Sequence, residues 1–429
     1  MLHFIVWFFL ILLRLYSMEI ILPAPHSEGQ ERLIYSRQND VVFAGRRWGK
    51  TFTGCQRIIE SALEDPGLFW WVGLGWRSAS LKRAWRELKV FTRNIWTALG
   101  EKPDKYIRES SKELHLPGGG EIWMRTAERP DSLAGEGVKG VVLDEFTLMQ
   151  EIVWTEFVEA TLLDYNGWAL FIGVPKGNNW GAKLWRNCKE GPSSEWYGER
   201  SGWCAHHFPT SSNPRLPVER LADIKENTPS SLYQQEYEAK VIDHAGLVFK
   251  GIVECFGAER QYAALDGHTY VFGLDWGKKD DFTSIAIMDV DTKELVNLVR
   301  FNDIDYPEQL KRIGQVYRLF QPRCIIAEEN ALGVPLCDQL ENDKMPIKRF
   351  NTTNKSKRII IEALQVGFEQ KHIKIFNDPD LIKELEEYEC VMTKLGNIRY
   401  SAPPGGHDDT VMSLALAWNE CKYDIGISF

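Results

Sequence analysis

Residues 40–51 have the sequence DVVFAGRRWGKT, and an apolar pattern with helical spacing follows them as far as Pro66. A short β-branched stretch, a glycine turn and an amphipathic helix form the context in which phosphate-binding loops occur. Against the pattern G-x-x-x-x-G-K-[ST], Ala44 stands at the first glycine position. The stretch therefore predicts a strand, a phosphate-binding loop and a helix, with an ordinary glycine turn before a helix as the alternative.

The residue types of this loop suit the binding of a nucleoside triphosphate. Gly49 lets the backbone approach the phosphates, whose charge is stabilised by N–H groups at a helix N-terminus. Lys50 would reach the β- and γ-phosphates, and the Thr51 hydroxyl would ligate Mg²⁺. The candidate ATP-binding residues of the loop are Gly45, Arg46, Arg47, Trp48, Gly49, Lys50 and Thr51.

A second motif supports the first. Residues 138–145, VKGVVLDE, show a buried-strand pattern that ends in two adjacent carboxylates. Asp144 is placed to hold Mg²⁺ through water, and Glu145 to polarise the water that attacks the γ-phosphate. A solvated acidic turn is the alternative. Together the motifs predict an ATPase core with a mostly parallel sheet and helices on both faces.

Two further apolar stretches, 68–75 and 169–175, predict buried strands of the same sheet. The double tryptophan Trp70-Trp71 in the first of them is interpreted as core rather than as a platform for stacking bases.

This half of the chain resembles the ATPase domain of large terminase subunits, the DNA-packaging motors of tailed bacteriophages and their prophages. Arg46 matches an arginine four residues before the family's lysine, and Gln30 matches an adenine-contacting glutamine. The family's coupling segment resembles G-T-P, whereas this chain has valine at position 174, so the role of a hydroxyl there is in doubt. Arg125 and Arg129 are candidate charge-stabilising arginines, although surface arginines are common.

From Tyr270 the sequence becomes rich in strands. YVFGLDWG, FTSIAIMDV and ELVNLVRF predict three successive strands, and a helix over about 307–320 follows. An apolar strand at 324–327 ends in two glutamates, and Gly406-His407-Asp408-Asp409 opens an apolar helix. This order predicts an RNase H-like domain with a mixed sheet.

Three distant carboxylates are candidate metal ligands in this domain: Asp275, Glu328 and Asp409. Two-metal nucleases need carboxylates that converge on two divalent ions about 4 Å apart, and carboxylates prefer hard cations such as Mg²⁺ and Mn²⁺. Each residue alone has a structural alternative, because an aspartate before a helix can be an N-cap and a glutamate can end a strand in solvent.

The same triple resembles the terminase nuclease domain, in which D-W-G, E-x-N-x-x-G and H-D-D recur. Here these motifs stand at 275–277, 328–333 and 407–409. The resemblance favours Glu328 over Glu329, because Asn330 lies two residues after it, and Asp409 over Asp408. Three neighbours stay candidates, each with a structural alternative. Asp281 is a further ligand of one metal or a turn cap. His407 is a proton shuttle, although a structural hydrogen bond is the preferred interpretation, and Asp408 is the third ligand in place of Asp409 or a helix N-cap.

The predicted organisation has four parts. An apolar extension covers 1–17, an ATPase domain 18–205, a linker subdomain 206–246 and the nuclease domain 247–429. The extension is interpreted as an over-extended start before Met18, with a membrane anchor and a buried N-terminal element as alternatives. The linker has a surface helix pair of the ATPase domain as its alternative.

The net charge is −9, which excludes a protein held to nucleic acid by bulk charge. The eight cysteines are scattered without a Cys-x-x-Cys pair, which argues against a disulfide framework or a zinc knuckle. Local basic side chains are candidate DNA-phosphate contacts or ordinary solvated cations: Lys278, Lys279, Lys348, Arg349, Lys355, Lys357 and Arg358.

These patterns and the resemblance imply a large terminase subunit. It would use ATP and Mg²⁺ to move double-stranded DNA into a procapsid, and two Mg²⁺ or Mn²⁺ ions to cut the DNA concatemer. The implied partners are a portal ring, a small terminase subunit and further copies in a ring, in the cytoplasm of a bacterial host cell. The alternatives are a helicase-like repair ATPase with a fused RNase H-type nuclease, and an inactive prophage remnant.

Overall fold

The computed structural model describes residues 22–190, 202–242, 246–277, 282–329, 333–392 and 398–421. The chain forms two compact units, one made of Met1–Leu221 with Gln234–Ile242 and the other of Ala222–Tyr233 with Asp243–Phe429. The predicted extension 1–17 lies outside the described residues. In the described part of the chain, no helix is long and apolar enough to cross a membrane.

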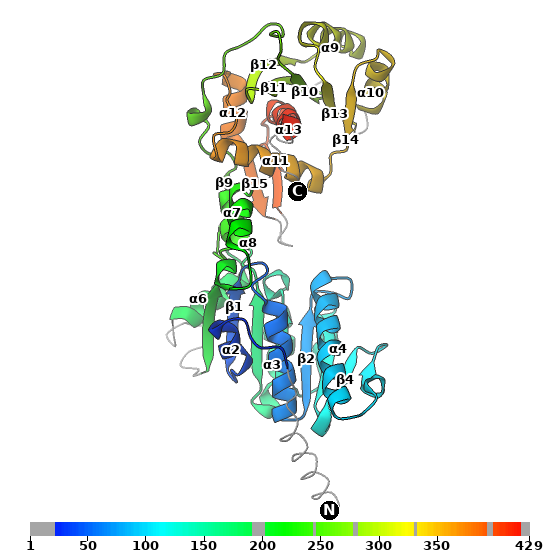
Figure 1. The fold of residues 1–429 in the computed structure, drawn as a ribbon, viewed down its shortest axis with the longest axis vertical. Coiled ribbons are helices and arrows are strands. Elements are labelled where there is room, and N and C mark those ends of the chain that lie inside the picture. Colours follow the sequence, from blue (N-terminus) through cyan, green and yellow to red (C-terminus); the bar gives the residue numbers. More distant parts are fainter. Residues whose placement is uncertain are drawn as a thin grey trace, which may run out of the picture. The chain divides into compact units, whose positions relative to one another are not determined.

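The first unit is built on a sheet of eight strands (Figure 1). In spatial order they are β3 (Ile107–Arg108), β4 (Glu113–His115), β5 (Glu121–Thr126), β2 (Leu68–Gly73), β6 (Gly140–Asp144), β7 (Trp168–Gly173), β1 (Asn39–Ala44) and β8 (Trp203–Phe208). The last six strands in this spatial order, β5, β2, β6, β7, β1 and β8, run parallel to one another. At the other edge, β4 and β3 are added as antiparallel strands. The prediction of a mostly parallel sheet is confirmed.

Alternating side chains place apolar groups on both faces of this sheet. Val42 packs with α2 (Glu28–Ile34), α3 (Lys50–Glu64) and α4 (Ala79–Ala98), whereas its neighbour Val41 packs with residues of α6 (Trp180–Glu190) on the other face. A strand buried on both sides in this way reads as a continuous apolar run. The pair Trp70-Trp71 follows the same rule, since the two rings lie in opposite cores and are 1 % and 0 % exposed. Their interpretation as core residues is confirmed.

The second unit contains a mixed sheet of five strands. Their spatial order is β12 (Glu294–Phe301), β11 (Thr283–Asp289), β10 (Tyr270–Asp275), β13 (Cys324–Glu328) and β14 (Ile347–Phe350). β11 is antiparallel to both of its neighbours, β12 and β10, and β13 and β14 run parallel to β10. This is the mixed sheet that the sequence predicts for an RNase H-like domain.

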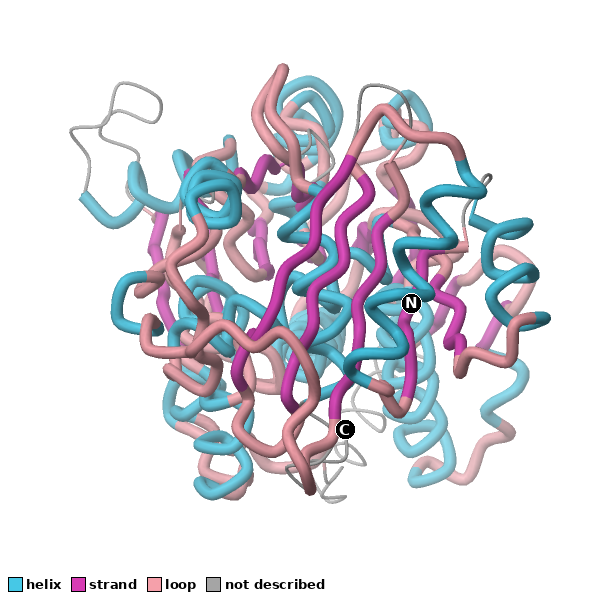
Figure 2. The backbone as a smooth tube through the Cα atoms, turned by 90° about the horizontal axis from the view of Figure 1, so that it is seen from above, coloured by secondary structure: helices cyan, strands magenta, loops and turns pink. Residues whose placement is uncertain are grey.

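Helices cover both faces of this second sheet. One core joins it to α11 (Asn354–Glu369), α12 (Pro379–Glu387) and α13 (Asp409–Cys421), and the other joins it to α9 (Tyr306–Phe320) and α10 (Gly333–Asn342). Figure 2 shows long strands that run side by side with helices packed along them. A small antiparallel sheet is formed by β9 (Gly246–Leu247), β15 (Glu389–Met392) and β16 (Ile398–Ser401).

The polar stretch from Val218 to Lys240, within the predicted linker subdomain, contains two helices. They are α7 (Val218–Glu226) and α8 (Ser230–Glu236). The break has a local cause, because Pro229 lacks the N–H that a continuing helix needs and disfavours helical geometry in the residue before it.

Candidate nucleotide and metal sites

The phosphate-binding loop connects β1 to α3 through two residues with left-handed backbone. Arg47 has a φ of 66° and Gly49 a φ of 114°, and glycine adopts the latter without the strain that a Cβ would cause. Lys50, the first residue of α3, folds its side chain back over the loop, where Nζ donates to the carbonyl oxygens of Ala44 at 2.6 Å and Gly45 at 3.0 Å. Burial lowers the pKa of Lys50 to about 8, against the opposing charge of Asp144.

Three side chains hold successive carbonyl groups of the loop. Thr210 Oγ1 donates to the carbonyl of Arg46 at 2.7 Å, and Asn213 Nδ2 donates to that of Arg47 at 2.9 Å. Gln30 Nε2 donates to the carbonyl of Trp48 at 2.8 Å. The loop is therefore fixed before a ligand arrives. Sequence reasoning missed Thr210 and Asn213, which lie in the stretch assigned to the linker subdomain.

Two predicted ATP-binding side chains are engaged inside the protein in this structure. The Gln30 amide is fully buried, and its Oε1 accepts from the N–H of His26 at 2.8 Å while Nε2 braces the loop. The Trp48 ring is fully buried and stacks on Phe208 at 4.4 Å. Trp48 would therefore contact a nucleotide through its backbone and not through its ring.

The two adjacent carboxylates stand at the end of β6 as the sequence predicts. Asp144 is 2 % exposed, and its Oδ2 is buried without a hydrogen-bond partner among the described residues. Burial and the neighbouring Glu145 raise the pKa of Asp144 to about 7, while Lys50 opposes the shift. Glu145 has a φ of 59°, a conformation that non-glycine residues adopt rarely and often at functional sites. A buried carboxylate oxygen without a donor, beside the Lys50 ammonium, fits a hydrated Mg²⁺ ion.

The segment after β7 has valine at position 174 and so no hydroxyl of its own there, but it accepts a hydrogen bond from the hydroxyl of another residue. Thr147 Oγ1 donates to the Val174 carbonyl at 2.9 Å, and the Thr147 carbonyl accepts from Asn179 Nδ2 at 2.6 Å. This hydrogen bond links the turn after Glu145 to the expected coupling segment.

Of the two candidate arginines, Arg125 lies on β5, which is separated from β6 by β2. Its guanidinium covers the Trp123 ring at 4.6 Å from the centroid, and Nη1 donates to the Met124 carbonyl. Arg129 precedes a short helical turn, and its carbonyl accepts from Ser132. Nothing in these contacts brings either side chain to the loop.

In the second unit, two predicted metal ligands end neighbouring parallel strands. Leu274 of β10 pairs with Ala327 of β13, so Asp275 and Glu328 follow at the same edge of the sheet. Burial and the charge of Glu328, followed by Asp409 and Asp408, raise the pKa of Asp275 well above its usual range. Mutually repelling buried carboxylates of this kind suit the binding of divalent cations.

The third predicted ligand, Asp409, is 6 % exposed in the first turn of α13. Its Oδ2 accepts from the N–H of Phe282 at 3.3 Å and lies 3.8 Å from Arg300 Nη2 and 3.7 Å from His407 Nδ1. The N–H groups of Thr410 and Val411 instead donate to Glu384 Oε2. Glu384 therefore accepts the N–H groups in the first turn of α13. The N-cap role that was the structural alternative for Asp409 is filled by Glu384 instead.

Asp408 has different surroundings. Its Oδ2 accepts from Lys357 Nζ at 2.8 Å and lies 3.4 Å from the Tyr388 hydroxyl. Asp281 lies outside the described residues. Glu329 continues past β13, where its N–H donates to the Phe350 carbonyl.

Steric crowding explains why the last position of the E-x-N-x-x-G stretch is glycine. A Cβ on Gly333 would lie 2.0 Å from the Glu328 carbonyl oxygen, so only glycine lets α10 begin against the end of β13. The motif thus fixes the backbone of Glu328 from a position five residues downstream.

The three carboxylates do not crowd around a single point. Among the described residues, three ligand atoms lie within 4.8 Å of one another in two other groups, Asp40 with Cys204 and His206, and His268 with Asp289 and Asp291. Two ions about 4 Å apart would spread their carboxylates more widely than one ion does. The oxygen-only donor set of Asp275, Glu328 and Asp409 fits hard divalent cations.

Residues 272–420 match the family model of the terminase RNase H-like domain. This region is therefore similar to that domain. The predicted resemblance to large terminase subunits is confirmed. The large terminase subunit of Thermus virus P23-45 is 29 % identical over 324 residues, which are 71 % of this chain and 66 % of that protein. That of Escherichia phage T5 is 25 % identical over 189 residues, 41 % of this chain and 40 % of that protein.

The match therefore spans about two thirds of the length of the Thermus virus relative. A solved structure extends the likeness of fold to both units. The large terminase of a thermophilic bacteriophage has a TM-score of 0.54 at 12 % identity, with 92 % of this chain and 99 % of that chain covered. At that identity the comparison concerns the fold alone.

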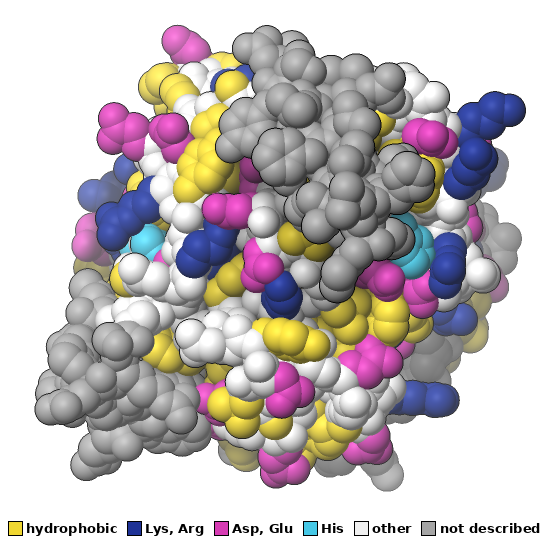
Figure 3. All heavy atoms as spheres, turned by 90° about the horizontal axis from the view of Figure 1, so that it is seen from below, with side chains coloured by type: hydrophobic (Ala, Val, Ile, Leu, Met, Phe, Trp, Pro, Cys, Tyr) yellow, Lys and Arg dark blue, Asp and Glu magenta, His cyan; other side chains and the backbone are white. Residues whose placement is uncertain are grey.

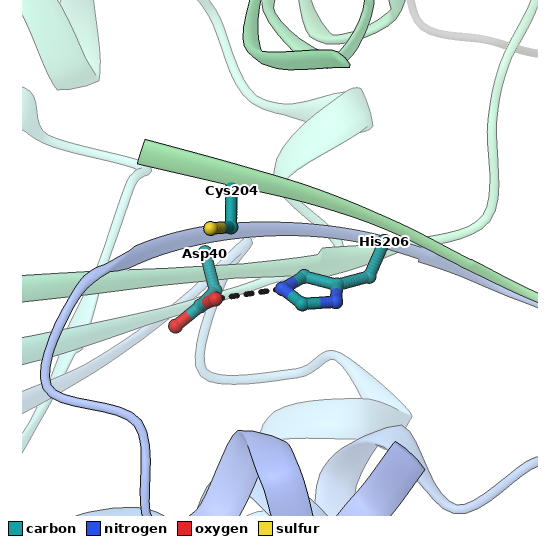
Figure 4. Close-up of side chains that lie close together, drawn as sticks. All are labelled: Asp40, Cys204 and His206. Atoms are coloured by element: carbon teal, nitrogen blue, oxygen red, sulfur yellow. Dashed lines mark hydrogen bonds and ion pairs between the residues drawn. The ribbon is translucent and has the colours of Figure 1, made fainter. Parts of the chain in front are cut away.

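One of the tight ligand groups, Asp40 with Cys204 and His206, is a satisfied polar cluster in the terminase-like first unit. Figure 4 shows the Asp40 carboxylate of β1 beside the His206 ring of β8, with Oδ1 2.7 Å from Nε2. Asp40 Oδ2 accepts from Arg57 Nη1 at 2.5 Å and from the Ser36 hydroxyl at 2.6 Å. Because a guanidinium already neutralises this carboxylate, the cluster fits a structural role better than a cation site.

Four of the basic side chains that are candidate DNA-phosphate contacts, those of Lys348, Arg349, Lys357 and Arg358, are paired with acids in the structure. Lys348 Nζ binds Glu420 at 2.6 Å, and Arg349 Nη2 binds Asp338 at 2.5 Å. Lys278 and Lys279 lie outside the described residues. On the face drawn in Figure 3, basic and acidic side chains of the described residues are interspersed rather than gathered by sign.

Proposed function

We propose that this chain is a large terminase subunit, a motor that moves double-stranded DNA at the cost of ATP and cuts it at a separate site. The observation that carries the proposal is that one chain has two candidate sites of different kinds. One would bind phosphates and the other divalent cations, and they follow one another in the order of the terminase domains. In the first unit, a hydrogen-bonded loop with a partly buried lysine would bind the phosphates, and in the second, three carboxylates would bind the cations. A helicase-like repair ATPase would need a second ATPase-like domain where the terminase RNase H-like domain lies.

At the first site, ATP would lie along the loop. Lys50 would leave its two carbonyl partners for the phosphates, and the N–H groups at the start of α3, which have no partner within the helix, would face them. Thr51 and, through water, Asp144 would hold Mg²⁺. Glu145 would orient the attacking water, and Gln30 would meet the adenine by exchanging its present bonds.

At the second site, Asp275, Glu328 and Asp409 would hold two divalent cations. Two such ions, when bound, activate water and stabilise the leaving 3′ oxygen of a phosphodiester. The protein's own part is to hold the three carboxylates in place. Phe282 and Arg300 fix one oxygen of Asp409, and the close start of α10 at Gly333 fixes the backbone of Glu328.

The partners follow from the family and belong to the same proposal. The motor would act as a ring of subunits on the portal of a procapsid, with a small terminase subunit that selects the DNA, in the cytoplasm of a bacterial host.

ATP hydrolysis tests the first site. Lys50→Ala should lower the turnover of ATP about a hundredfold or more, because the developing charge on the phosphates loses the cation that stabilises it. Lys82→Ala, which removes an exposed lysine of α4, is the matched control and should leave turnover unchanged. Equal turnover in the wild type and Lys50→Ala would contradict the assignment of the loop.

Plasmid cleavage tests the second site. The full chain should nick or linearise plasmid DNA with Mn²⁺ or Mg²⁺ and stop when the metal is chelated. Asp275→Asn should reduce cleavage to background, whereas Asp266→Asn, at an exposed position before β10, should cut as the wild type does. Undiminished cleavage by Asp275→Asn would overturn the proposed triple.

A further inference from the structure

Thr283, the first residue of β11, has a buried hydroxyl that joins three parts of the second unit. The residue is 1 % exposed. Its Oγ1 accepts from the N–H of Gly277 at 3.0 Å and donates to Gln309 Oε1 at 2.9 Å. Gln309, a buried residue of α9, donates in turn from Nε2 to the Ile304 carbonyl at 3.2 Å. These hydrogen bonds form a buried chain from α9 through β11 to the turn after β10.

This chain of hydrogen bonds lies on the face of the sheet opposite to the candidate metal ligands. Successive side chains of a strand point to opposite faces. Leu274 and Ile285 pack in the core that includes α9, whereas Gly273 lies against the backbone of α13. By this alternation Asp275 shares the face of Gly273, and Thr283 shares that of Ile285. The helix α9 therefore reaches the backbone beside Asp275 from the other side of the sheet.

The Thr283 hydroxyl also ties together the two ends of the connection between β10 and β11, and each end adjoins a proposed metal ligand. Gly277 lies two residues after Asp275. It is buried and lies past the last paired residue of β10, so the hydroxyl accepts an N–H that would be costly to leave unpaired. At the other end, Thr283 follows Phe282, whose N–H donates to Asp409 Oδ2.

We propose that Thr283, oriented by Gln309, is a positioning residue for the divalent cations of the second site. It fixes the backbone beside Asp275 relative to the N–H group that holds Asp409, and so arranges two of the carboxylates before the ions bind. The inference rests on the proposed function, since it assumes that these carboxylates bind metal. Groups that stand behind the ligands and orient them contribute to the affinity of a site for its metal.

The test is a titration of the full chain with Mn²⁺, without nucleotide, that follows the rise in the melting temperature of the second unit. The part of the rise that Asp275→Asn lacks belongs to the second site. Thr283→Val keeps the shape of the side chain and removes the hydroxyl. It should raise the Mn²⁺ concentration for half of this effect about tenfold, because an outer partner of the site is lost. Thr283→Ser keeps the hydroxyl and should need the wild-type concentration.

Plasmid cleavage at increasing Mn²⁺ gives a second readout. Thr283→Val should need about tenfold more metal for half of its maximal rate. The rate at saturating Mn²⁺ should stay close to that of the wild type, because the carboxylates themselves are unchanged. A residue that merely supports the fold would not shift the metal requirement while leaving the maximal rate intact.

Two further variants complete the test. Gln309→Met removes the group that orients the hydroxyl and should also raise the Mn²⁺ requirement. Combined with Thr283→Val it should add little, because both residues act through one chain of hydrogen bonds. The control is Thr92→Val, which removes a fully buried hydroxyl that donates to the Leu88 carbonyl within α4 of the first unit. It should leave the metal requirement unchanged.

An unchanged Mn²⁺ requirement in a folded Thr283→Val would overturn the inference, as would a loss of cleavage that saturating metal does not restore. A raised requirement in Thr283→Ser would do the same. If Thr283→Val does not fold, Gln309→Met carries the test, and an unchanged requirement there contradicts the role of the chain. A wild type that Mn²⁺ stabilises no more than Asp275→Asn would instead contradict the proposed metal site, so the two failures are distinguishable.

Discussion

At the scale of single residues, the first unit depends on a charge pair that is removed from solvent. The side chains of Arg57 and Asp40 are 0 % and 2 % exposed. Arg57 also donates to the Gln38 carbonyl and covers the Trp168 ring at 4.2 Å. The pair ties α3, the helix that opens with Lys50, to the strand that leads into the phosphate loop. Removing one partner leaves the other charge buried without compensation.

Arg57→Met should therefore lower the free energy of unfolding of the first unit by about 3–5 kcal/mol. Arg93→Met is the control, because Arg93 makes an exposed ion pair with Asp104 at 3.6 Å, and such pairs contribute about 0–1 kcal/mol. Urea unfolding measures both. A loss for Arg57→Met no larger than that for Arg93→Met would show that the buried pair does not stabilise the unit.

The same pair makes stability depend on acid. Burial alone would raise the pKa of Asp40, but the hydrogen bond of His206 and the charge of Arg57 lower it below its usual range. A carboxylate with a lowered folded pKa stabilises the fold above the pKa of about 3.9 that it has when unfolded. This contribution is lost as the pH falls through the folded value.

Wild type should thus lose more stability between pH 5 and pH 3 than Asp40→Asn does, as measured by urea unfolding at each pH. The two proteins share the other acids of the chain, so the difference between them isolates Asp40. Parallel acid profiles would contradict the role of this carboxylate.

At the candidate sites, short sequence patterns point to the residues proposed to carry the chemistry, but they do not point to the residues that support them. Lys50, Asp144 and Asp275 stand in short patterns whose spacing carries meaning. Thr210 and Asn213, which hold the loop, lie more than 150 positions from it, and no local pattern marks a side chain that will meet a distant carbonyl group.

At the scale of elements, the third carboxylate is placed by the packing of α13 on β10. A Cβ on Gly273 would lie 1.9 Å from the Ser413 carbonyl oxygen and 2.6 Å from the Ala417 nitrogen. The helix backbone therefore rests directly on the strand backbone. Ser284 Oγ, on the adjacent strand β11, lies 2.8 Å from Ser413 Oγ. This close packing sets the distance between Asp409, at the start of α13, and Asp275, at the end of β10.

Gly273→Ala should force α13 away from the sheet, lower the melting temperature of the second unit by several degrees and reduce plasmid cleavage. Gly314→Ala, within α9, is the matched control. A Cβ there would meet its nearest neighbour at 3.6 Å, which is ordinary contact, and alanine is favoured over glycine in a helix by about 0.5–1 kcal/mol. If Gly273→Ala melts and cuts as Gly314→Ala does, close packing does not position Asp409.

Element prediction succeeded where apolar runs are long. The buried strands β1, β2, β6, β7 and β10 to β13 stand where continuous apolar residues predict them. The antiparallel edge of the first sheet was not predicted, because β3 and β4 have two and three residues, too few for a periodic signal.

At the scale of the whole molecule, the two candidate sites lie in different units. The sequence order of the motifs was enough to predict both fold classes. It was not enough to predict that Gln234–Ile242 belongs to the first unit after the chain has contributed Ala222–Tyr233 to the second. The chain returns to the first unit because residues such as Glu236 contact residues such as Arg46, which are far away in the sequence.

The central claim is that ATP hydrolysis and DNA cleavage belong to different sites of one chain. The most direct measurement applies both assays to the same three preparations of the full chain: wild type, Lys50→Ala and Asp275→Asn. We expect Lys50→Ala to cleave plasmid with Mn²⁺ as well as wild type while its ATP turnover is lost, and Asp275→Asn to show the reverse. Loss of both activities in either variant, in a protein that melts at the wild-type temperature, would contradict the account.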